Sequence, residues 1–151
     1  MLMDVSNVVN KLRQKQAEKD KVYKERSNNL NQVTKELNNK IKLINVENNK
    51  ELDDYLNRKL QDSIDRNVYT FSLNRHDFNH IYNILNVKDM LTAKLLKAYN
   101  DCQGSQYSLD NRVYKTMFKK LNKYINKQNN IKSTFMTVDT REYELMVYIS
   151  L

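Results

Sequence analysis

Turn-forming residues are almost absent from this chain, whose 151 residues include no proline and a single glycine, Gly104. Proline and glycine supply the fixed or positive φ angles that most tight turns need, so barrels and sandwiches built from many hairpins are disfavoured. Long helices are the structure that this composition favours. The length allows one domain with a modest extension, which argues against a multidomain enzyme.

Residues 1–66 read as long helix. Their apolar side chains recur at steps of three, four and eight, and three of them lie eleven residues apart: Leu30, Ile41 and Leu52. So narrow a stripe must pair with another helix, either by folding back as a hairpin or by forming a dimeric coiled coil. Both alternatives stay open, and weak helix formers at 26–31 and 45–50 mark two places for a break. We expect a homodimer through this arm, with these contacts: Leu30, Val33, Leu37, Ile41, Ile44 and Leu52.

Residues 67–151 read as a small α+β domain. Asn74 offers an N-cap with Asp77 three residues later, and Ser108 is expected to cap a long helix. The last nineteen residues alternate on both sides of Asp139 and Thr140, as in a hairpin whose inner face holds Tyr143, Leu145, Val147 and Ile149. The expected elements are a strand at 67–74, a short helix from Asn74, a second helix from about Lys88 to Gly104, a basic helix at 109–128 and this hairpin.

The predicted fold class is therefore mainly α (α+β), with a helical pairing arm at 1–66 and a small α+β domain at 67–151. One strand, three helices and a hairpin resemble the order of elements in a winged-helix domain. That resemblance implies that the third helix enters the major groove of DNA and that the hairpin acts as the wing. The segment 103–111 departs from the pattern, because a winged helix has a tight turn before its recognition helix.

Positive charge is concentrated in the second half of the sequence. The chain has a net charge of +8, of which residues 1–66 contribute +3 and residues 67–151 contribute +5. The stretch from Arg112 to Lys132 alone holds seven basic side chains and no acid. Such a balance favours an acidic partner, such as nucleic acid, although it says nothing about the fold.

The basic and apolar side chains of this stretch separate on a helical wheel. At about 100° per residue, the apolar side chains fill one arc and the cations fill the other. The cations are candidate phosphate contacts, which bind without reading sequence, and Arg112 alone could make a bidentate contact to guanine. The alternative is an ordinary solvated face whose lysines reflect an AT-rich genome. The candidate nucleic-acid-binding residues are Arg112, Lys115, Lys119, Lys120, Lys123 and Lys127.

Candidate catalytic or metal-binding residues are few. His76 and His80 have the i, i+4 spacing of a zinc motif, but Asp77 between them is explained as a helix cap and no third ligand follows a known pattern. Cys102 follows the apolar spacing of its helix and cannot form an intrachain disulfide. We therefore expect no enzyme activity, no metal and no cofactor. Without a signal peptide or a long apolar run, a reducing cytoplasm and no membrane contact are expected.

Three functions from different classes fit these patterns. The first is a non-enzymatic DNA-binding accessory or regulatory protein that uses the basic helix and the hairpin. The alternative is a protein-interaction module, an inhibitor or adaptor of phage or mobile-element type that grips a partner through its long helices. The third is a scaffolding protein whose arm drives assembly. The DNA-binding hypothesis leads because the charge lies on one geometrical face.

Overall fold

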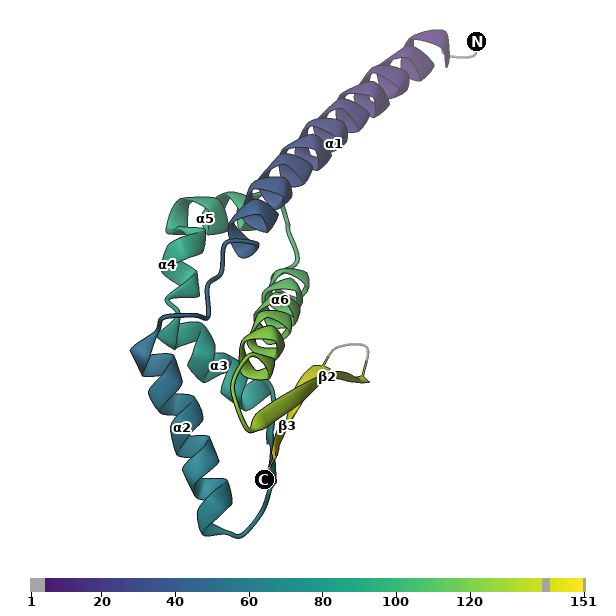
Figure 1. The fold of residues 1–151 in the computed structure, drawn as a ribbon. Coiled ribbons are helices and arrows are strands. Elements are labelled where there is room, and N and C mark those ends of the chain that lie inside the picture. Colours follow the sequence, from purple (N-terminus) through teal and green to yellow (C-terminus); the bar gives the residue numbers. More distant parts are fainter. Residues whose placement is uncertain (1–4, 140–141, 151) are drawn as a thin grey trace.

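A long helix leads into a small domain of shorter helices and one antiparallel sheet (Figure 1). The computed structural model describes residues 5–139 and 142–150. This architecture confirms the predicted class, mainly α with a small β component. The elements are, in order, α1 (Val5–Ile41), α2 (Lys50–Asp65), β1 (Thr70–Leu73), α3 (Arg75–Ile84), α4 (Val87–Leu91), α5 (Ala93–Asp101), α6 (Gln106–Asn126), β2 (Ile131–Asp139) and β3 (Glu142–Ile149).

Helix α1 runs without interruption through residues 26–31, where the weak helix formers predict a break. That prediction is wrong because the helix is anchored within and beyond the segment: Leu30 and Val33 pack against the core, and Leu37 and Ile41 are buried in it. Serine and asparagine cost only about half a kcal/mol each in a helix, which tertiary packing readily offsets.

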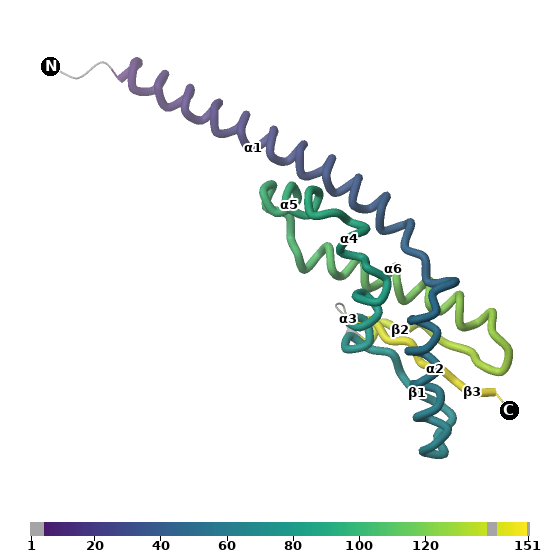
Figure 2. Tube along the Cα trace, turned by 90° about the vertical axis from the view of Figure 1, so that its left-hand side faces the viewer, coloured from purple at the N-terminus to yellow at the C-terminus, as the bar shows by residue number. Residues whose placement is uncertain are grey.

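The second predicted break, at residues 45–50, is confirmed. Helix α1 ends at Ile41 and α2 begins at Lys50, after Asn48 adopts a left-handed φ of 56°. Asn49 then caps α2, since its Oδ1 accepts a hydrogen bond from the Leu52 N–H at 3.0 Å. The two helices point away from each other instead of folding back as a hairpin (Figures 1 and 2).

One hydrophobic core takes in residues from both predicted parts of the chain. Leu37 and Leu52, from the predicted arm, are buried in the same cluster as Leu145, from the small domain. The carboxyl-terminal part of α1 packs against α4, α5 and α6, whereas α2 packs against α3 and β1. Separate functions for residues 1–66 and 67–151 therefore remain a prediction. The hydrophobic core itself is continuous across residue 66.

The predicted hairpin is joined by the predicted strand in a three-stranded sheet of order β1-β3-β2, antiparallel throughout. Val147 of β3 lies opposite Phe71 of β1 and Ser133 of β2. Of the four residues predicted to share one face, Tyr143, Leu145 and Val147 are buried on the face that α6 covers, and Ile149 at the end of β3 is half-buried. The turn expected at Asp139 and Thr140 lies partly outside the described residues.

Helix α6 lies at the centre of the domain, between the sheet and α1. Met117, Phe118 and Leu121 are fully buried. Tyr114 packs against Phe118 and donates its hydroxyl hydrogen to the backbone C=O of Tyr143, and its burial raises the pKa of this phenol to about 12. The predicted apolar arc of the wheel is thus the core-facing side of α6.

The connection from α3 to α6 differs in detail from the prediction. The capping box formed by Asn74 and Asp77 is confirmed. The single helix expected after Lys88 is divided into α4 and α5, because Thr92 has a φ of 67° and its hydroxyl caps α5. Helix α6 begins earlier than expected, since Ser105 is its cap and its hydroxyl accepts from the Ser108 N–H at 3.2 Å.

Gly104 is required where the chain turns from α5 into α6. A Cβ atom at this position would lie 2.5 Å from the ring of Tyr99. The Gly104 N–H also donates to the C=O of Tyr99 at 2.8 Å. Tyr99 is itself held by a hydrogen bond of 2.8 Å from its hydroxyl to the C=O of Ser105. This close approach fixes the start of α6, the helix that carries the candidate cations.

Candidate nucleic-acid interface

The six candidate cations of α6 and its end divide into two groups. One group, Arg112, Lys120 and Lys127, is turned toward α1 and the connection between α1 and α2. The other group, the lysines at 115, 119 and 123, is exposed. The wheel places all six outside the core correctly, but it cannot show that α1 passes along one side of α6.

Arg112 is held inside the fold by three hydrogen bonds. Its Nη1 donates to Oδ1 of Asn38 at 2.6 Å, its Nη2 to the hydroxyl of Tyr99 at 3.4 Å, and its Nε to the C=O of Ser108 at 3.3 Å. These contacts join α1, α5 and α6 through one guanidinium. A bidentate contact to guanine needs the same donors, so the structure offers Arg112 a structural role instead.

Lys120 binds the first residues of the connection between α1 and α2. Its ammonium donates to the C=O groups of Lys42 and Ile44, each at 2.5 Å. Both carbonyl groups belong to the connection that follows α1, which ends at Ile41, and a backbone carbonyl without a partner in a helix or strand needs a donor such as this ammonium. Desolvation by burial lowers the pKa of Lys120. This lysine is therefore engaged by its own chain.

Lys127 forms an ion pair with Glu47, with 2.9 Å between Nζ and Oε1. The side chains are 64% and 45% exposed, so solvent screens the pair strongly. Of the three engaged cations, Lys127 is therefore the one that a stronger anion can most readily detach from its partner.

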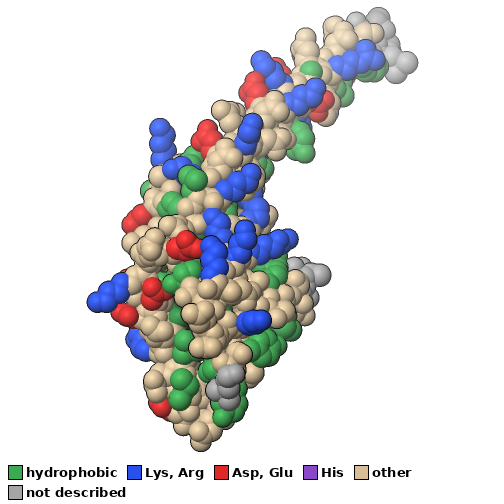
Figure 3. Space-filling model, in the orientation of Figure 1, with side chains coloured by type: hydrophobic (Ala, Val, Ile, Leu, Met, Phe, Trp, Pro, Cys, Tyr) green, Lys and Arg blue, Asp and Glu red, His purple; other side chains and the backbone are tan. Residues whose placement is uncertain are grey.

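Lys115, Lys119 and Lys123 form a row on the exposed side of α6. Their i, i+4 spacing places successive side chains about 6 Å apart along the axis. Lys119 extends toward the sheet, with its Nζ 6.0 Å from the centre of the Phe135 ring in β2. The ion pairs found among the described residues involve none of the three lysines. Figure 3 shows Lys and Arg side chains gathered over the region where α1 meets α6.

The residues predicted to mediate oligomerisation are largely committed to the core. Leu37, Ile41, Ile44 and Leu52 are at most 3% exposed, and Leu30 and Val33 pack partly against the same cluster. In this structure their partners are side chains of the same chain. The exposed apolar side chains of α1 lie nearer its amino end instead, at Val5, Val8, Leu12, Val22 and Tyr23.

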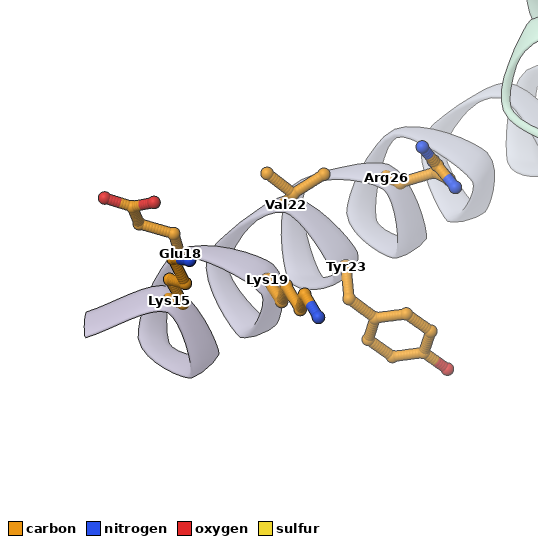
Figure 4. A pocket seen from close by; sticks show the side chains of 6 residues that line it. All are labelled: Lys15, Glu18, Lys19, Val22, Tyr23 and Arg26. Carbon is orange, nitrogen blue, oxygen red and sulfur yellow. The ribbon is translucent and has the colours of Figure 1, made fainter. Parts of the chain in front are cut away.

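A shallow hollow on α1 is formed by side chains of this single helix, as Figure 4 shows. Tyr23, 73% exposed, extends into solvent, and Lys19 and Arg26 lie on either side of it in sequence. Because no second element supplies a wall, the hollow does not enclose a small ligand. Its lining shows that the middle of α1 combines cations with one aromatic ring.

The residues of the possible metal motif, Asp77, His76 and His80, contact other side chains of the same chain. Asp77 is 1% exposed and accepts hydrogen bonds from the Tyr55 hydroxyl at 2.5 Å, the Lys59 ammonium at 2.8 Å and the Asn74 N–H at 2.9 Å. His76 and His80 contact each other at 3.3 Å between their Nε2 atoms. Within residues 5–139 and 142–150, no three His, Cys, Asp or Glu side chains are grouped to hold a metal ion.

Comparison with protein-family models, with curated proteins and with solved structures found no match to this chain. No helix in the described part of the chain combines the length and the apolar composition that crossing a bilayer requires.

Proposed function

We propose that this chain is a DNA-binding accessory or regulatory protein that contacts phosphates through Lys115, Lys119 and Lys123. The observation that carries the proposal is the row itself. Three exposed lysines follow one another on a helix side that holds no acid between residues 111 and 132. Each lysine acts as a mobile point charge that displaces condensed counterions from the duplex.

The arrangement of the sheet supports this placement. Helix α6 directly precedes the β2–β3 hairpin, and β1 pairs with β3 in the order β1-β3-β2. In a winged-helix-like arrangement the helix before the hairpin meets the duplex and the hairpin lies beside it. The Lys119 Nζ lies 6.0 Å from the centre of the Phe135 ring in β2, which supports a surface shared by this lysine and the hairpin.

Binding by this row is expected to be independent of DNA sequence. Lysine lacks the fixed pair of donors with which arginine recognises guanine, and Arg112 is engaged by Asn38, Tyr99 and Ser108. The logarithm of the binding constant should fall with the logarithm of salt concentration by about 0.9 per neutralised phosphate, so the row contributes a slope of about −2.7.

The test is fluorescence anisotropy of a labelled random duplex at low and near-physiological salt. Lys119→Glu/Lys123→Glu should abolish binding, while circular dichroism shows an unchanged fold because both side chains are exposed. Lys21→Glu/Lys24→Glu on the exposed part of α1 changes the net charge equally and serves as the matched control. Equal losses in the two variants would show that net charge alone drives binding, and the proposal would then be wrong.

A second candidate function is a protein-interaction module, an inhibitor or adaptor that works in the cytoplasm. The exposed apolar side chains Val5, Val8 and Leu12 favour it, since they lie on a helix that extends away from the domain. A complex of this kind survives salt, whereas phosphate binding by lysines weakens steeply. Absence of duplex binding even at low salt would favour this second function over the first.

A further inference from the structure

A pair of imidazole side chains lies on the exposed side of α3. His76 in the first turn of this helix and His80 in the second are the only histidines of the sequence, and both are exposed. Their Nε2 atoms are 3.3 Å apart. The ring centres are 4.7 Å apart and the ring planes meet at 80°, so the rings do not stack face to face. Two nitrogens of the kind that binds transition metals therefore border one small space.

The distance between these nitrogens fits a tetrahedral ion. Zinc binds imidazole nitrogen at about 2.0–2.1 Å, and two ligands of a tetrahedral ion subtend an angle of about 109°. Such ligands lie about 3.3 Å apart, which matches the distance between the two Nε2 atoms. Adjacent ligands of a square-planar ion with the same bond length lie only about 2.9 Å apart. The spacing of the pair therefore suits Zn²⁺ without a shift of either ring.

Without an ion, the two rings share one hydrogen. One Nε2 carries it and the other Nε2 accepts the hydrogen bond. A metal ion needs both Nε2 lone pairs, so both rings then carry their hydrogen on Nδ1. Because both residues are exposed, water can accept hydrogen bonds from the two Nδ1–H groups. Binding an ion thus replaces one hydrogen bond between the rings and leaves the core packing unchanged.

The backbone that carries the pair is fixed by neighbouring contacts. Asn74 and Asp77 form the capping box that starts α3. The Asp77 carboxylate binds the Lys59 ammonium at 2.8 Å and the Tyr55 hydroxyl at 2.5 Å, which ties the first turn of α3 to α2. The centre of the Tyr55 ring also lies 5.7 Å from that of His80. A site held in place before binding loses less conformational entropy when the ligand arrives.

The pair differs from the catalytic zinc motif that its spacing resembles. Asp77 is 1% exposed, and its carboxylate is bonded to Lys59, Tyr55 and the Asn74 N–H instead of facing the imidazoles. Among residues 5–139 and 142–150, no third His, Cys, Asp or Glu joins the pair in a group that could hold a metal ion. Two imidazoles chelate an ion without a third protein ligand, and water then completes the coordination. The arrangement is therefore a binding site of lower affinity than a structural zinc site.

We propose that His76 and His80 form a surface site that chelates one Zn²⁺ ion through their Nε2 atoms. The ion joins the first two turns of α3, since residues four apart lie on the same side of a helix. It stabilises the folded chain, because an unfolded segment does not hold the two rings at the required distance. This site does not depend on nucleic-acid binding by the lysine row.

The test is isothermal titration of zinc chloride into untagged protein without nucleic acid. A Cys102→Ser background removes the only thiol of the sequence. We expect one ion per chain. His76→Gln and His80→Gln should each weaken binding by at least about tenfold, because a single imidazole cannot chelate. The matched control, His80→Gln/Asn83→His, keeps two histidines on one side of α3 but places them about 10 Å apart along the axis, and it should bind as weakly as His80→Gln.

Each of these substitutions is at an exposed position, so circular dichroism should show the same helix content in all variants. Three results would overturn the proposal. They are no zinc binding by the intact pair at millimolar zinc, unchanged binding in either single variant, and equal affinity in the control with displaced histidines.

Nitrogen NMR of protein with isotopically labelled histidine supplies an independent measurement. Because the sequence has only two histidines, the two single variants assign every ring signal. Zinc should shift both Nε2 signals, and it should raise the urea midpoint of the intact pair but not that of His76→Gln. A shift confined to one ring, or binding through Nδ1, would exclude the chelate.

Discussion

The side chain of Asn126 binds both backbone groups of Ser133. Its Oδ1 accepts a hydrogen bond from the Ser133 N–H at 2.8 Å, and its Nδ2 donates to the Ser133 C=O at 3.1 Å. A neighbouring strand would make the same pair of hydrogen bonds, and β2 lies at the edge of the sheet. The end of α6 therefore blocks part of an edge that could otherwise pair with another chain.

Replacing Asn126 with alanine should expose this edge. We expect a loss of about 1–2 kcal/mol in the free energy of unfolding, because two hydrogen bonds to the backbone disappear. We also expect more aggregation at high concentration, measured by light scattering alongside denaturant unfolding. Asn79→Ala, at an exposed position of α3, is the control and should change neither quantity. Unchanged aggregation in Asn126→Ala would contradict the proposed protection of the edge.

Lys120 and Lys123 should respond differently to the same substitution. Lys120→Met removes a charge-assisted contact with the carbonyl groups of Lys42 and Ile44 and should lower the free energy of unfolding by about 1.5–3 kcal/mol. Lys123→Met, at an exposed site, should change it by less than about 0.5 kcal/mol and should weaken DNA binding instead. Denaturant titrations and anisotropy on both variants check this division, and reversed effects would refute it.

Much of the fold follows from local patterns in the sequence. The capping box at Asn74 depends on side chains three residues apart, and the alternation from Tyr143 to Val147 depends on neighbours in one strand. The contact between Arg112 and Asn38 joins residues 74 positions apart in the sequence. Wheel geometry assigns Arg112 to a polar side, but it cannot tell solvent from a crossing helix. For this reason the wheel cannot distinguish the three cations that contact their own chain, Arg112, Lys120 and Lys127, from the three exposed lysines.

Asp77 should make the fold sensitive to acid. Its burial favours the neutral form, but hydrogen bonds from Lys59, Tyr55 and the Asn74 N–H outweigh this effect and lower its pKa from the ordinary 3.8. A lowered carboxylate pKa stabilises the fold at pH values above the unfolded pKa, and this contribution is lost as the pH falls through the folded pKa. Stability should therefore decline as the pH falls below about 4.

Asp77→Asn tests this source of acid sensitivity. The amide is isosteric but cannot ionise, so the variant should be less stable at pH 7 and should show a shallower loss of stability between about pH 4 and pH 2. Urea unfolding at several pH values measures both effects. Asp89→Asn, at an exposed carboxylate of α4, is the control. A pH profile of Asp77→Asn that parallels that of the unmodified chain would assign the acid sensitivity to other carboxylates.

Tyr124, which is bonded to Asp53 of α2, should make the fold sensitive to alkali. The hydrogen bond from its hydroxyl to Asp53, together with desolvation, raises its pKa from 10.0 to about 12. Between these values the unfolded chain releases the phenolic proton while the folded chain retains it, so stability falls as the pH rises. Burial raises the pKa of Tyr114 to the same value, which adds a second loss over the same range.

Tyr124→Phe should remove only the first contribution and flatten the decline between about pH 10 and pH 12, as denaturant titrations can measure. Tyr23→Phe, on the exposed part of α1, is the matched control, and equal flattening in both variants would exclude the bond between Tyr124 and Asp53 as the cause.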